Sequence, residues 1–333
     1  MTLVLGVDAG GTSTRAAIAD GEGRLLGRSV ATAGNLDDGG PSGVAAAVMA
    51  ATRSALEVTG IGADATFDAV FLGVAGVVSA ADRRAVLDAL PTAGVAPRER
   101  IRIDHDCRVA LAGGLAGRPG IVVIAGTGSA AFGVDGGGAR WRSGGWGALV
   151  GDEGSSYSIA VEALRAVVRA VDGRGPSTAL QAAMLGALQV QDPDDLLHRL
   201  HLEGLGRAEV AALAPLVVLA AEQGDLVAAM VLDTAAEQLA QMVDAVQRNL
   251  RFDGPVEVAS VGGLFAAGEP IASRFREALE RRSPSVCMVE PELDPVLGAC
   301  LLALQSLGAA DGALVSRLRS VRDSASPSGA AEA

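Results

Sequence analysis

Short apolar stretches separated by glycine turns open the chain, and stretches with helical periodicity follow them. Apolar or alternating runs of about four to eight residues predict strands, whereas apolar residues that recur every three or four positions predict helices. The elements expected in the first part of the chain are strands at 2–7, 15–19 and 24–31, a helix at 42–58, a strand at 69–74, a helix at 80–90, a strand at 100–104 and a helix that starts at 106. This order predicts a three-stranded meander followed by alternating helices and strands.

The same order begins again about 115 residues later. The elements expected in this second part are strands at 120–125, 129–134 and 139–142, a mostly helical region at 155–249, a strand at 256–260, a helix at 270–281, a strand at 285–289 and a helix at 294–307. A strand–turn–strand–turn–strand unit that occurs twice indicates two domains built on one fold. We therefore predict an N-terminal domain at 1–115, a C-terminal domain at 116–320 with a helical insertion, and a disordered tail at 321–333 that is rich in Ser, Pro and Ala.

Composition narrows the possible functions. The 333 residues are 50% hydrophobic and carry a formal net charge of −12, which suits a globular enzyme and disfavours a nucleic-acid partner, because phosphate backbones need clustered Lys and Arg. No basic leader or long uninterrupted apolar stretch is evident, so we expect a cytoplasmic protein without a membrane partner. The three cysteines, Cys107, Cys287 and Cys300, show no paired spacing and are expected to be free thiols.

The first glycine turn carries the side chains that a phosphate group requires. Asp8 ends a strand and is followed by Gly10, Gly11, Thr12 and Thr14. Glycines let successive N–H groups point into one concavity that binds an oxyanion, and threonine hydroxyls can add donors. A carboxylate at the end of the strand can hold hydrated Mg²⁺ beside the phosphates. An ordinary glycine hairpin is the alternative interpretation.

A second turn repeats this chemistry in the second half of the chain, with Gly126, Thr127, Gly128 and Ser129. Two turns of this kind could bind the phosphates of one nucleotide, although either alone is a weak signal. Neither turn is a Walker P-loop or a Rossmann fingerprint, because the spacing of both motifs is absent.

A third glycine pair, Gly262 and Gly263, lies between a strand and the next helix. Glycines at such a turn let the backbone approach a flat ring closely, which would suit adenosine. A plain strand–helix turn is the alternative.

These motifs together resemble those of a known family. The segments Asp8-Ala9-Gly10-Gly11-Thr12, Gly126-Thr127-Gly128-Ser129 and Gly262-Gly263 look like the two phosphate motifs and the adenosine motif of the sugar kinase/actin/heat-shock chaperone superfamily. More narrowly, Gly144-Gly145-Trp146-Gly147 followed by Gly151-Asp152-Glu153-Gly154-Ser155 resembles the N-acetylglucosamine kinase family, which is related to the BadF/BadG-type ATPases.

The resemblance implies a fold, a reaction and partners. The fold would be α/β, with two ribonuclease-H-like domains, a mixed central sheet in each and an interdomain cleft. The reaction would be the ATP- and Mg²⁺-dependent phosphorylation of an amino sugar, such as N-acetylglucosamine or glucosamine to its 6-phosphate. A homodimer is also expected.

The resemblance also assigns roles to single residues. Asp106 lies about twenty residues before the second turn and matches the catalytic base and a sugar ligand; Asp104 is the rival base, and a helix N-cap is the alternative role of either. Asn35 and Asp152 match sugar contacts, although the residues after Asn35 depart from the family pattern and Asp152 could instead cap a helix. Trp146 stacks near the sugar or braces its loop.

Two other functions share this fold. An activator-type ATPase would couple hydrolysis to electron transfer, but it needs paired cysteines for an iron–sulfur cluster, and the isolated cysteines here do not fit. A non-catalytic sugar sensor would regulate transcription, but the net negative charge disfavours DNA binding. The sequence therefore favours the kinase.

Overall fold

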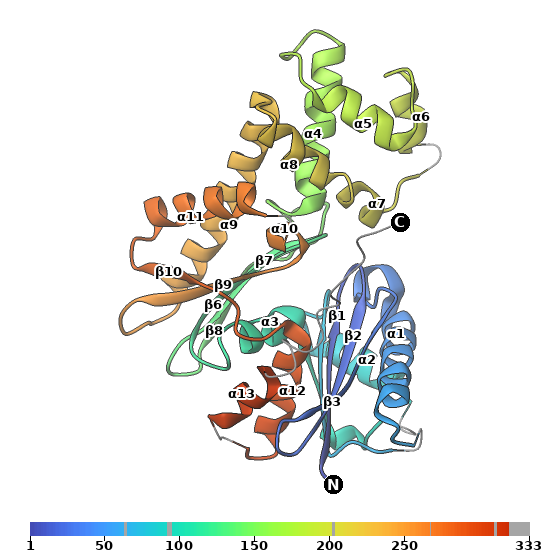
Figure 1. The fold of residues 1–333 in the computed structure, drawn as a ribbon, viewed down its shortest axis with the longest axis vertical. Coiled ribbons are helices and arrows are strands. Elements are labelled where there is room, and N and C mark those ends of the chain that lie inside the picture. The colour runs from blue at the N-terminus through green and yellow to red at the C-terminus, as the bar shows by residue number, and fades with distance from the viewer. Residues whose placement is uncertain (63–64, 92–94, 202–203, 267, 310–311, 320–333) are drawn as a thin grey trace, which may run out of the picture. The chain divides into compact units, whose positions relative to one another are not determined.

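The computed structural model describes the chain except for residues 63–64, 92–94, 202–203, 267, 310–311 and 320–333. The chain forms two compact units, each with its own sheet (Figure 1). The first unit combines Met1–Arg118 with the chain from Pro291 onward, and the second is Pro119–Glu290. The tail predicted at 321–333 lies outside the described residues.

The first sheet has five strands in the order β3-β2-β1-β4-β5. Its strands are β1 (Leu3–Ala9), β2 (Thr14–Asp20), β3 (Leu25–Ala31), β4 (Ala69–Val74) and β5 (Ile101–His105). The first three form an antiparallel meander, and β4 and β5 add in parallel beside β1. Its helices are α1 (Leu36–Thr59), α2 (Ala80–Ala89) and α3 (Asp106–Gly114), with the short η1 (Arg98–Arg100) before β5.

The second sheet repeats this arrangement with the order β10-β9-β6-β7-β8. Its strands are β6 (Gly120–Ala125), β7 (Ser129–Val134), β8 (Arg140–Gly144), β9 (Val256–Val261) and β10 (Val286–Val289). Antiparallel pairs join β6, β7 and β8, and parallel pairs join β6, β9 and β10. The internal repeat and the α/β fold with a mixed sheet in each half are thus confirmed.

Both faces of the first sheet are covered by helices. Because side chains alternate along a strand, Leu5 and Val7 of β1 point to one face and pack with residues of α1, such as Val48. Val4 points to the opposite face and packs with α12 (Pro295–Ser306) through residues such as Leu297. Burial on both faces explains why β1 reads as a continuous apolar run.

The position of α12 corrects the predicted domain boundaries. The prediction assigned 116–320 to the second domain. In the structure, the first unit extends to residue 118 and also includes the chain from Pro291 onward. The physical reason is the apolar face of α12, which completes the core on β1; the buried Cys300 thiol also donates a hydrogen bond to the Ala17 carbonyl of β2 at 3.4 Å. A further short helix, α13 (Ala313–Arg319), was not predicted and adds Leu314 to the same core.

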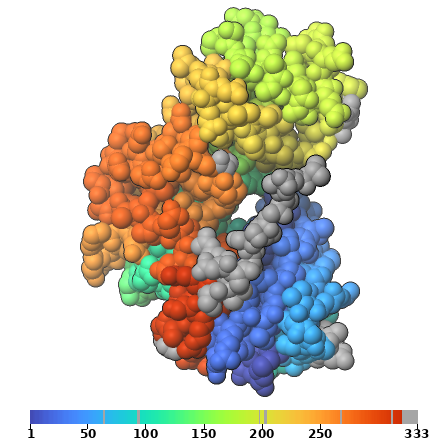
Figure 2. All heavy atoms as spheres, viewed as in Figure 1, coloured from blue at the N-terminus to red at the C-terminus, as the bar shows by residue number. Residues whose placement is uncertain are grey.

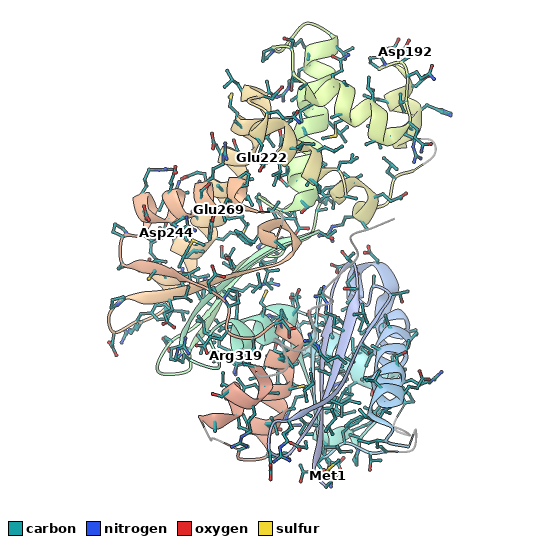
Figure 3. All side chains as sticks on the ribbon, in the orientation of Figure 1. Met1, Asp192, Glu222, Asp244, Glu269 and Arg319 are labelled. Atoms are coloured by element: carbon teal, nitrogen blue, oxygen red, sulfur yellow. The ribbon has the colours of Figure 1, made fainter. Side chains whose placement is uncertain are left out.

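A helical insertion enlarges the second unit between β8 and β9. It consists of α4 (Ser156–Val171), α5 (Leu180–Leu188), α6 (Asp195–His201), α7 (Arg207–Ala211), α8 (Ala214–Glu222) and α9 (Leu226–Asn249). Figure 2 shows α4 to α8, green to yellow, as a lobe of this unit. Exposed acidic residues such as Asp192 and Glu222 lie on its surface, in keeping with the net negative charge (Figure 3).

Helix α9 covers one face of the second sheet. Its Leu239 and Val243 lie in one core with Ile121 and Val123 of β6, and α11 (Glu269–Arg282) packs beside it. By length and composition this 24-residue helix could cross a membrane, contrary to the expectation from the sequence. In the structure, 44% of its apolar window is buried, and one face of the helix lies in the core of the second unit.

Helix α1 begins earlier than the predicted residue 42. The chain enters the helix at Leu36 and leaves helical geometry at Gly40, where φ is 59° and ψ is −178°. Pro41 cannot continue the first turn, because its ring would clash with the carbonyl four residues back. The helix therefore starts with one capped turn, kinks and resumes, which the periodicity alone did not show.

Candidate functional site

The first glycine–threonine turn closes the hairpin between β1 and β2. Ala9 pairs with Thr14, so that residues 10–13 form the turn. The Gly10 N–H donates to the Ser13 carbonyl at 3.0 Å, and the turn is held from outside by the Gly34 N–H, which donates to the Gly10 carbonyl at 3.1 Å. Backbone hydrogen bonds from within the turn and from Gly34 therefore hold the loop in place.

The two threonines of this turn lie in different surroundings. Thr12 is exposed, whereas Thr14 is fully buried and its hydroxyl has no hydrogen-bond partner in the described part of the chain. Thr12 is therefore accessible from solvent, whereas Thr14 is enclosed by the protein.

Asp8 is a half-buried carboxylate that lies next to a cationic side chain. It pairs across the hairpin with Arg15, and Arg15 Nη1 lies 3.7 Å from its carboxylate. Its pKa is raised from 3.8 to about 7, first by burial and then by the negative charge of Asp106, while Arg15 lowers it and Asp294 adds a smaller increase. Asp8, Asp106 and Asp294 thus form one group of electrostatically coupled carboxylates.

These surroundings suit a hard dication. Mg²⁺ is held through one or two carboxylates together with the phosphates of a nucleotide and retained waters. Asp8 stands two residues before the glycine turn, and burial together with the negative charge of Asp106 raises its pKa. A carboxylate oxygen at this position is a ligand type that fits Mg²⁺.

The junction between β5 and α3 separates the two candidate bases. The Asp104 carboxylate accepts a hydrogen bond from Arg83 at 2.8 Å and one from the His105 N–H at 3.0 Å. Burial alone would raise the pKa of Asp104, but the Arg83 hydrogen bond and the nearby charges of His105 and Arg83 lower it below its ordinary value. Asp104 is thus held as an ionised partner of Arg83.

Asp106 has different partners. It is the first residue of α3, and its Oδ1 accepts from the Cys107 N–H at 2.9 Å and from the Cys107 thiol at 3.6 Å. It makes no ion pair with any residue that the structure describes, and it is coupled electrostatically to Asp8. Its carboxylate is half-buried.

Asn35 caps α1. Its side-chain oxygen accepts from the Asp38 N–H at 2.8 Å, and its amide donates to the Asp38 carboxylate at 2.8 Å. The side chain is 4% exposed. The structure therefore gives Asn35 a structural role, next to the Gly34 amide that holds the first turn.

The second glycine–threonine turn closes the hairpin between β6 and β7. Ala125 pairs with Ser129, so that residues 126–128 form the turn. The Gly126 carbonyl accepts from the Ser156 N–H at 2.8 Å, and the Ser129 hydroxyl donates to the Glu153 carbonyl at 2.6 Å. This turn is thus braced by the start of α4.

Asp152 and Arg207 lie against this second turn. The Asp152 carboxylate is buried, forms an ion pair with Arg207 and accepts from the Ser129 N–H at 3.3 Å. A Cβ atom at Gly128 would lie 2.7 Å from Arg207 Nη2 and 2.9 Å from Asp152 Oδ1, so a larger residue there would have to displace this ion pair. The prediction identified Asp152 but missed Arg207, because no local pattern links residues 55 positions apart.

The glycine pair after β9 adjoins the second turn. Gly262 has φ of 113°, and a Cβ atom at this position would lie 2.2 Å from the Ala125 carbonyl oxygen. Gly263 is exposed and starts the four-residue helix α10 (Gly263–Ala266), and its N atom lies 3.9 Å from where a Cβ of Gly126 would stand. The two predicted nucleotide motifs of this unit therefore lie next to each other.

Trp146 lies on the loop after β8 and is 70% exposed. The guanidinium carbon of Arg142 stands 5.4 Å from the centre of its ring, a cation–π contact that orients the indole. Sequence analysis missed Arg142 and Arg15. The register of the hairpin could have indicated Arg15, because Asp8 and Arg15 are the second pair before the turn.

The predicted residues therefore fall into two groups. Asp8, the first turn and Asp106 come together in the first unit, and the second turn, Asp152 and the Gly262–Gly263 pair come together in the second. A mixed sheet built twice in one order, with a glycine–threonine turn at the end of the first strand of each copy, defines an ATPase-type fold of the sugar kinase superfamily.

Comparison with known proteins gives the family. The model of the BadF/BadG/BcrA/BcrD ATPase family matches residues 5–303, and the chain belongs to this family. It is 30% identical to the N-acetylmuramic acid/N-acetylglucosamine kinase of Clostridium acetobutylicum and 29% identical to the N-acetyl-D-glucosamine kinase of Dictyostelium discoideum, in each case over 91% of this chain and 98% of the relative. The solved structure of a candidate N-acetylglucosamine kinase of Chromobacterium violaceum superposes with a TM-score of 0.77 at 28% identity, covering 92% of this chain and 99% of that one.

Proposed function

We propose that this protein is an ATP-dependent kinase that phosphorylates a hydroxyl group of an amino sugar, with N-acetylglucosamine or glucosamine as the expected substrate and its 6-phosphate as the product. Two relatives that span nearly the whole chain are kinases of N-acetylated amino sugars, which supports this substrate class. We further propose that it uses Mg²⁺, acts in the cytoplasm and forms a homodimer.

The observation that carries the proposal is the contrast between Asp104 and Asp106. Arg83 engages Asp104, whereas Asp106 makes no ion pair within the described residues and faces the same group of charges as Asp8. A carboxylate that serves as general base must be open to the proton that it accepts. Asp106 meets this requirement and Asp104 does not.

In the proposed reaction, the sugar hydroxyl oxygen attacks the γ-phosphorus of ATP while Asp106 accepts the hydroxyl proton, and ADP leaves. The N–H groups of the turns at residues 10–13 and 126–128 position the phosphates, and Gly262 and Gly263 admit the adenosine. Alignment and electrostatic stabilisation supply most of the acceleration of phosphoryl transfer. Mg²⁺, when bound at Asp8, would neutralise phosphate charge.

Further substrate contacts are proposed at Asn35, Trp146 and Asp152. The Asn35 amide has two N–H groups, and one donates to Asp38. The ring of Trp146 is exposed and suits the apolar face of a sugar. Asp152 would share its carboxylate between Arg207 and the sugar.

The test is ADP release from Mg·ATP against a panel of hexoses and amino sugars, with the phosphorylated hydroxyl identified by NMR of the product. Asp106→Asn should reduce turnover on the preferred amino sugar by roughly 100-fold to 10,000-fold, because it removes the general base. The matched control is Asp104→Asn, which keeps the proposed base and should retain turnover within about tenfold.

Two results would contradict the proposal. Equal losses in the two variants, or a larger loss in Asp104→Asn, would remove Asp106 from the role of base. ADP release that no sugar stimulates would instead favour an ATPase without a sugar substrate, such as an activator-type enzyme.

A further inference from the structure

Three consecutive side chains at the start of α3 bring different metal-binding atoms together. His105 offers an imidazole nitrogen, Asp106 a carboxylate oxygen and Cys107 a thiol sulfur, and these atoms all lie within 4.8 Å of one another. The chain changes there from extended backbone at His105, with φ of −67° and ψ of 156°, to the helix that starts at Asp106. This change of direction explains why three neighbouring side chains converge and do not alternate between opposite faces.

The separation of two of these atoms matches that of ligands on one zinc ion. Zinc binds oxygen at about 2.1 Å and thiolate sulfur at about 2.3 Å in tetrahedral geometry, so that two such ligands lie about 3.6 Å apart. Asp106 Oδ1 and Cys107 Sγ are 3.6 Å apart. A ring nitrogen of His105 lies within 4.8 Å of both atoms and offers a third ligand.

The charge around this cluster favours a dication. Asp106 is coupled electrostatically to Asp8, which is also coupled to Asp294. Arg15 and Arg28 offset this charge only in part, the first from 3.7 Å at Asp8 and the second through its ion pair with Asp294. A bound dication would lower the repulsion among the three carboxylates.

The ligand types distinguish this site from the proposed Mg²⁺ site. Mg²⁺ takes oxygen ligands, whereas zinc takes sulfur, nitrogen and oxygen together. Asp8 offers oxygen alone, while His105, Asp106 and Cys107 offer one donor of each kind. His105 and Asp106 are half-buried, and Cys107 is buried.

We propose that His105, Asp106 and Cys107 form an inhibitory zinc site, in which the ion binds the carboxylate that the proposed kinase uses as its base. Three protein ligands leave the fourth position to water, and the thiol proton passes to solvent when sulfur binds the ion. The inhibitory role rests on the proposed function, whereas the binding site does not.

Binding is tested on the full chain without nucleotide or sugar, so that no activity is needed as a readout. Titration with Co²⁺ should produce a thiolate-to-cobalt charge-transfer band in the near ultraviolet. The intensity of this band should stop rising when one equivalent of Co²⁺ has been added. Cys107→Ser should abolish this band, and the matched control Cys287→Ser, which removes an exposed thiol in the second unit, should keep it. A band that survives in Cys107→Ser or disappears in Cys287→Ser would overturn the site, as would the absence of any band.

Zinc affinity is measured by competition with a chromophoric chelator. Loss of groups that merely orient ligands weakens metal binding about 10-fold to 100-fold, so removal of a direct ligand should cost at least this much. His105→Gln provides the second variant, and its affinity decides the matter if Cys107→Ser does not fold. Unchanged zinc affinity in His105→Gln would overturn the three-ligand site.

The inhibitory role is tested separately on turnover. Zinc should reduce amino-sugar phosphorylation in the unmodified protein and in Cys287→Ser, with activity restored by a chelator, and Cys107→Ser should need at least tenfold more zinc for the same fractional loss. Zinc binding without inhibition of an active kinase would overturn the inhibitory role. Zinc binding in a protein that phosphorylates no sugar would leave the site standing and count against the proposed function alone.

Discussion

The two glycine–threonine turns end equivalent strands, but the residue pairs behind them differ in charge. Behind the first turn, Ala9–Thr14 is followed by the pair of Asp8 and Arg15. At the equivalent register behind the second turn, Ala125–Ser129 is followed by Ile124 and Ala130. Both units have the same hairpin and turn, but only the first hairpin has a charged pair at this register, Asp8 and Arg15.

This difference separates two tasks. The first unit holds the coupled carboxylates, which can bind a cation or accept a proton. The second turn is surrounded by backbone hydrogen bonds, by a neutralised Asp152–Arg207 pair and by the close approach of Gly262. We infer that the first unit supplies the reactive groups and that the second supplies a rigid surface for the nucleotide.

The largest expected effect comes from removing the charge that distinguishes the first turn. Asp8→Asn should lower Mg·ATP-dependent turnover by on the order of 1000-fold, because the proposed metal ligand and its charge are lost. The control Ile124→Val, at the equivalent position of the second hairpin, should change turnover by no more than a few-fold. Steady-state kinetics over a range of Mg²⁺ decides, and more than a tenth of the turnover remaining in Asp8→Asn would remove Asp8 from the metal site.

The same carboxylate makes stability depend on pH. The pKa of Asp8 is about 7 in the folded chain against an ordinary 3.8, so the folded chain keeps a proton that the unfolded chain releases. The free energy of unfolding should therefore fall as pH rises from about 4 to about 7 and stay lower above that. At 1.36 kcal/mol for each pKa unit, this corresponds to up to roughly 4 kcal/mol.

Asp8→Asn removes this dependence and should be more stable than the unmodified protein at pH 8 but not at pH 4. Urea unfolding of both proteins at several pH values measures the difference. Asp106, Asp294 and Arg15 are unchanged in the variant. If the difference in the free energy of unfolding between the two proteins does not change with pH, the Asp8 carboxylate does not cause the pH dependence.

The next effect concerns the ion pair beside the second turn. Arg207→Ala leaves the buried Asp152 carboxylate without its guanidinium partner and should lower the free energy of unfolding by about 3 kcal/mol. Asp152→Asn combined with Arg207→Ala should recover part of this loss, because no buried charge remains. Chemical denaturation checks both, and a loss below about 0.5 kcal/mol in Arg207→Ala would show that the turn does not depend on the pair.

The smallest expected effect is the difference between alanine substitutions at two neighbouring glycines, Gly262 and Gly263. Gly262→Ala should destabilise the protein by about 2 kcal/mol and raise the KM for ATP, because its φ of 113° and the nearby Ala125 carbonyl leave no room for a Cβ. Gly263→Ala meets no atom within 4 Å and should change stability by less than about 1 kcal/mol. Equal unfolding midpoints for the two variants would show that the close approach at Gly262 is not required.

Much of the fold could be predicted because its signals are local. The strand and turn patterns predicted the repeated sheet, and the bounds of β4, β6 and β7 agree with those expected from the sequence. The glycine turns were evident for the same reason, since only a few residue types allow a tight turn between two strands. The roles of the site residues remain predictions.

What escaped prediction depends on contacts between distant parts of the chain. The pairs Arg83–Asp104 and Arg207–Asp152 join residues 21 and 55 positions apart, and no periodicity indicates them. The capped first turn of α1 was missed because Gly40 and Pro41 read as helix breakers. The packing of α12 on the first sheet was missed, because an apolar sequence predicts that a helix is buried but not against which sheet it packs.

The return of α12 has a consequence for how the protein is made. The first unit is started by residues near the N-terminus, but the helix that covers Val4 and Ala17 on one face of its sheet comes from residues 295–306, after the entire second unit. During synthesis from the N-terminus, the second unit can fold from a continuous segment as it emerges, whereas the first must wait with an apolar face uncovered. The unit that carries Asp8 and Asp106 is therefore translated before the second unit and completed after it.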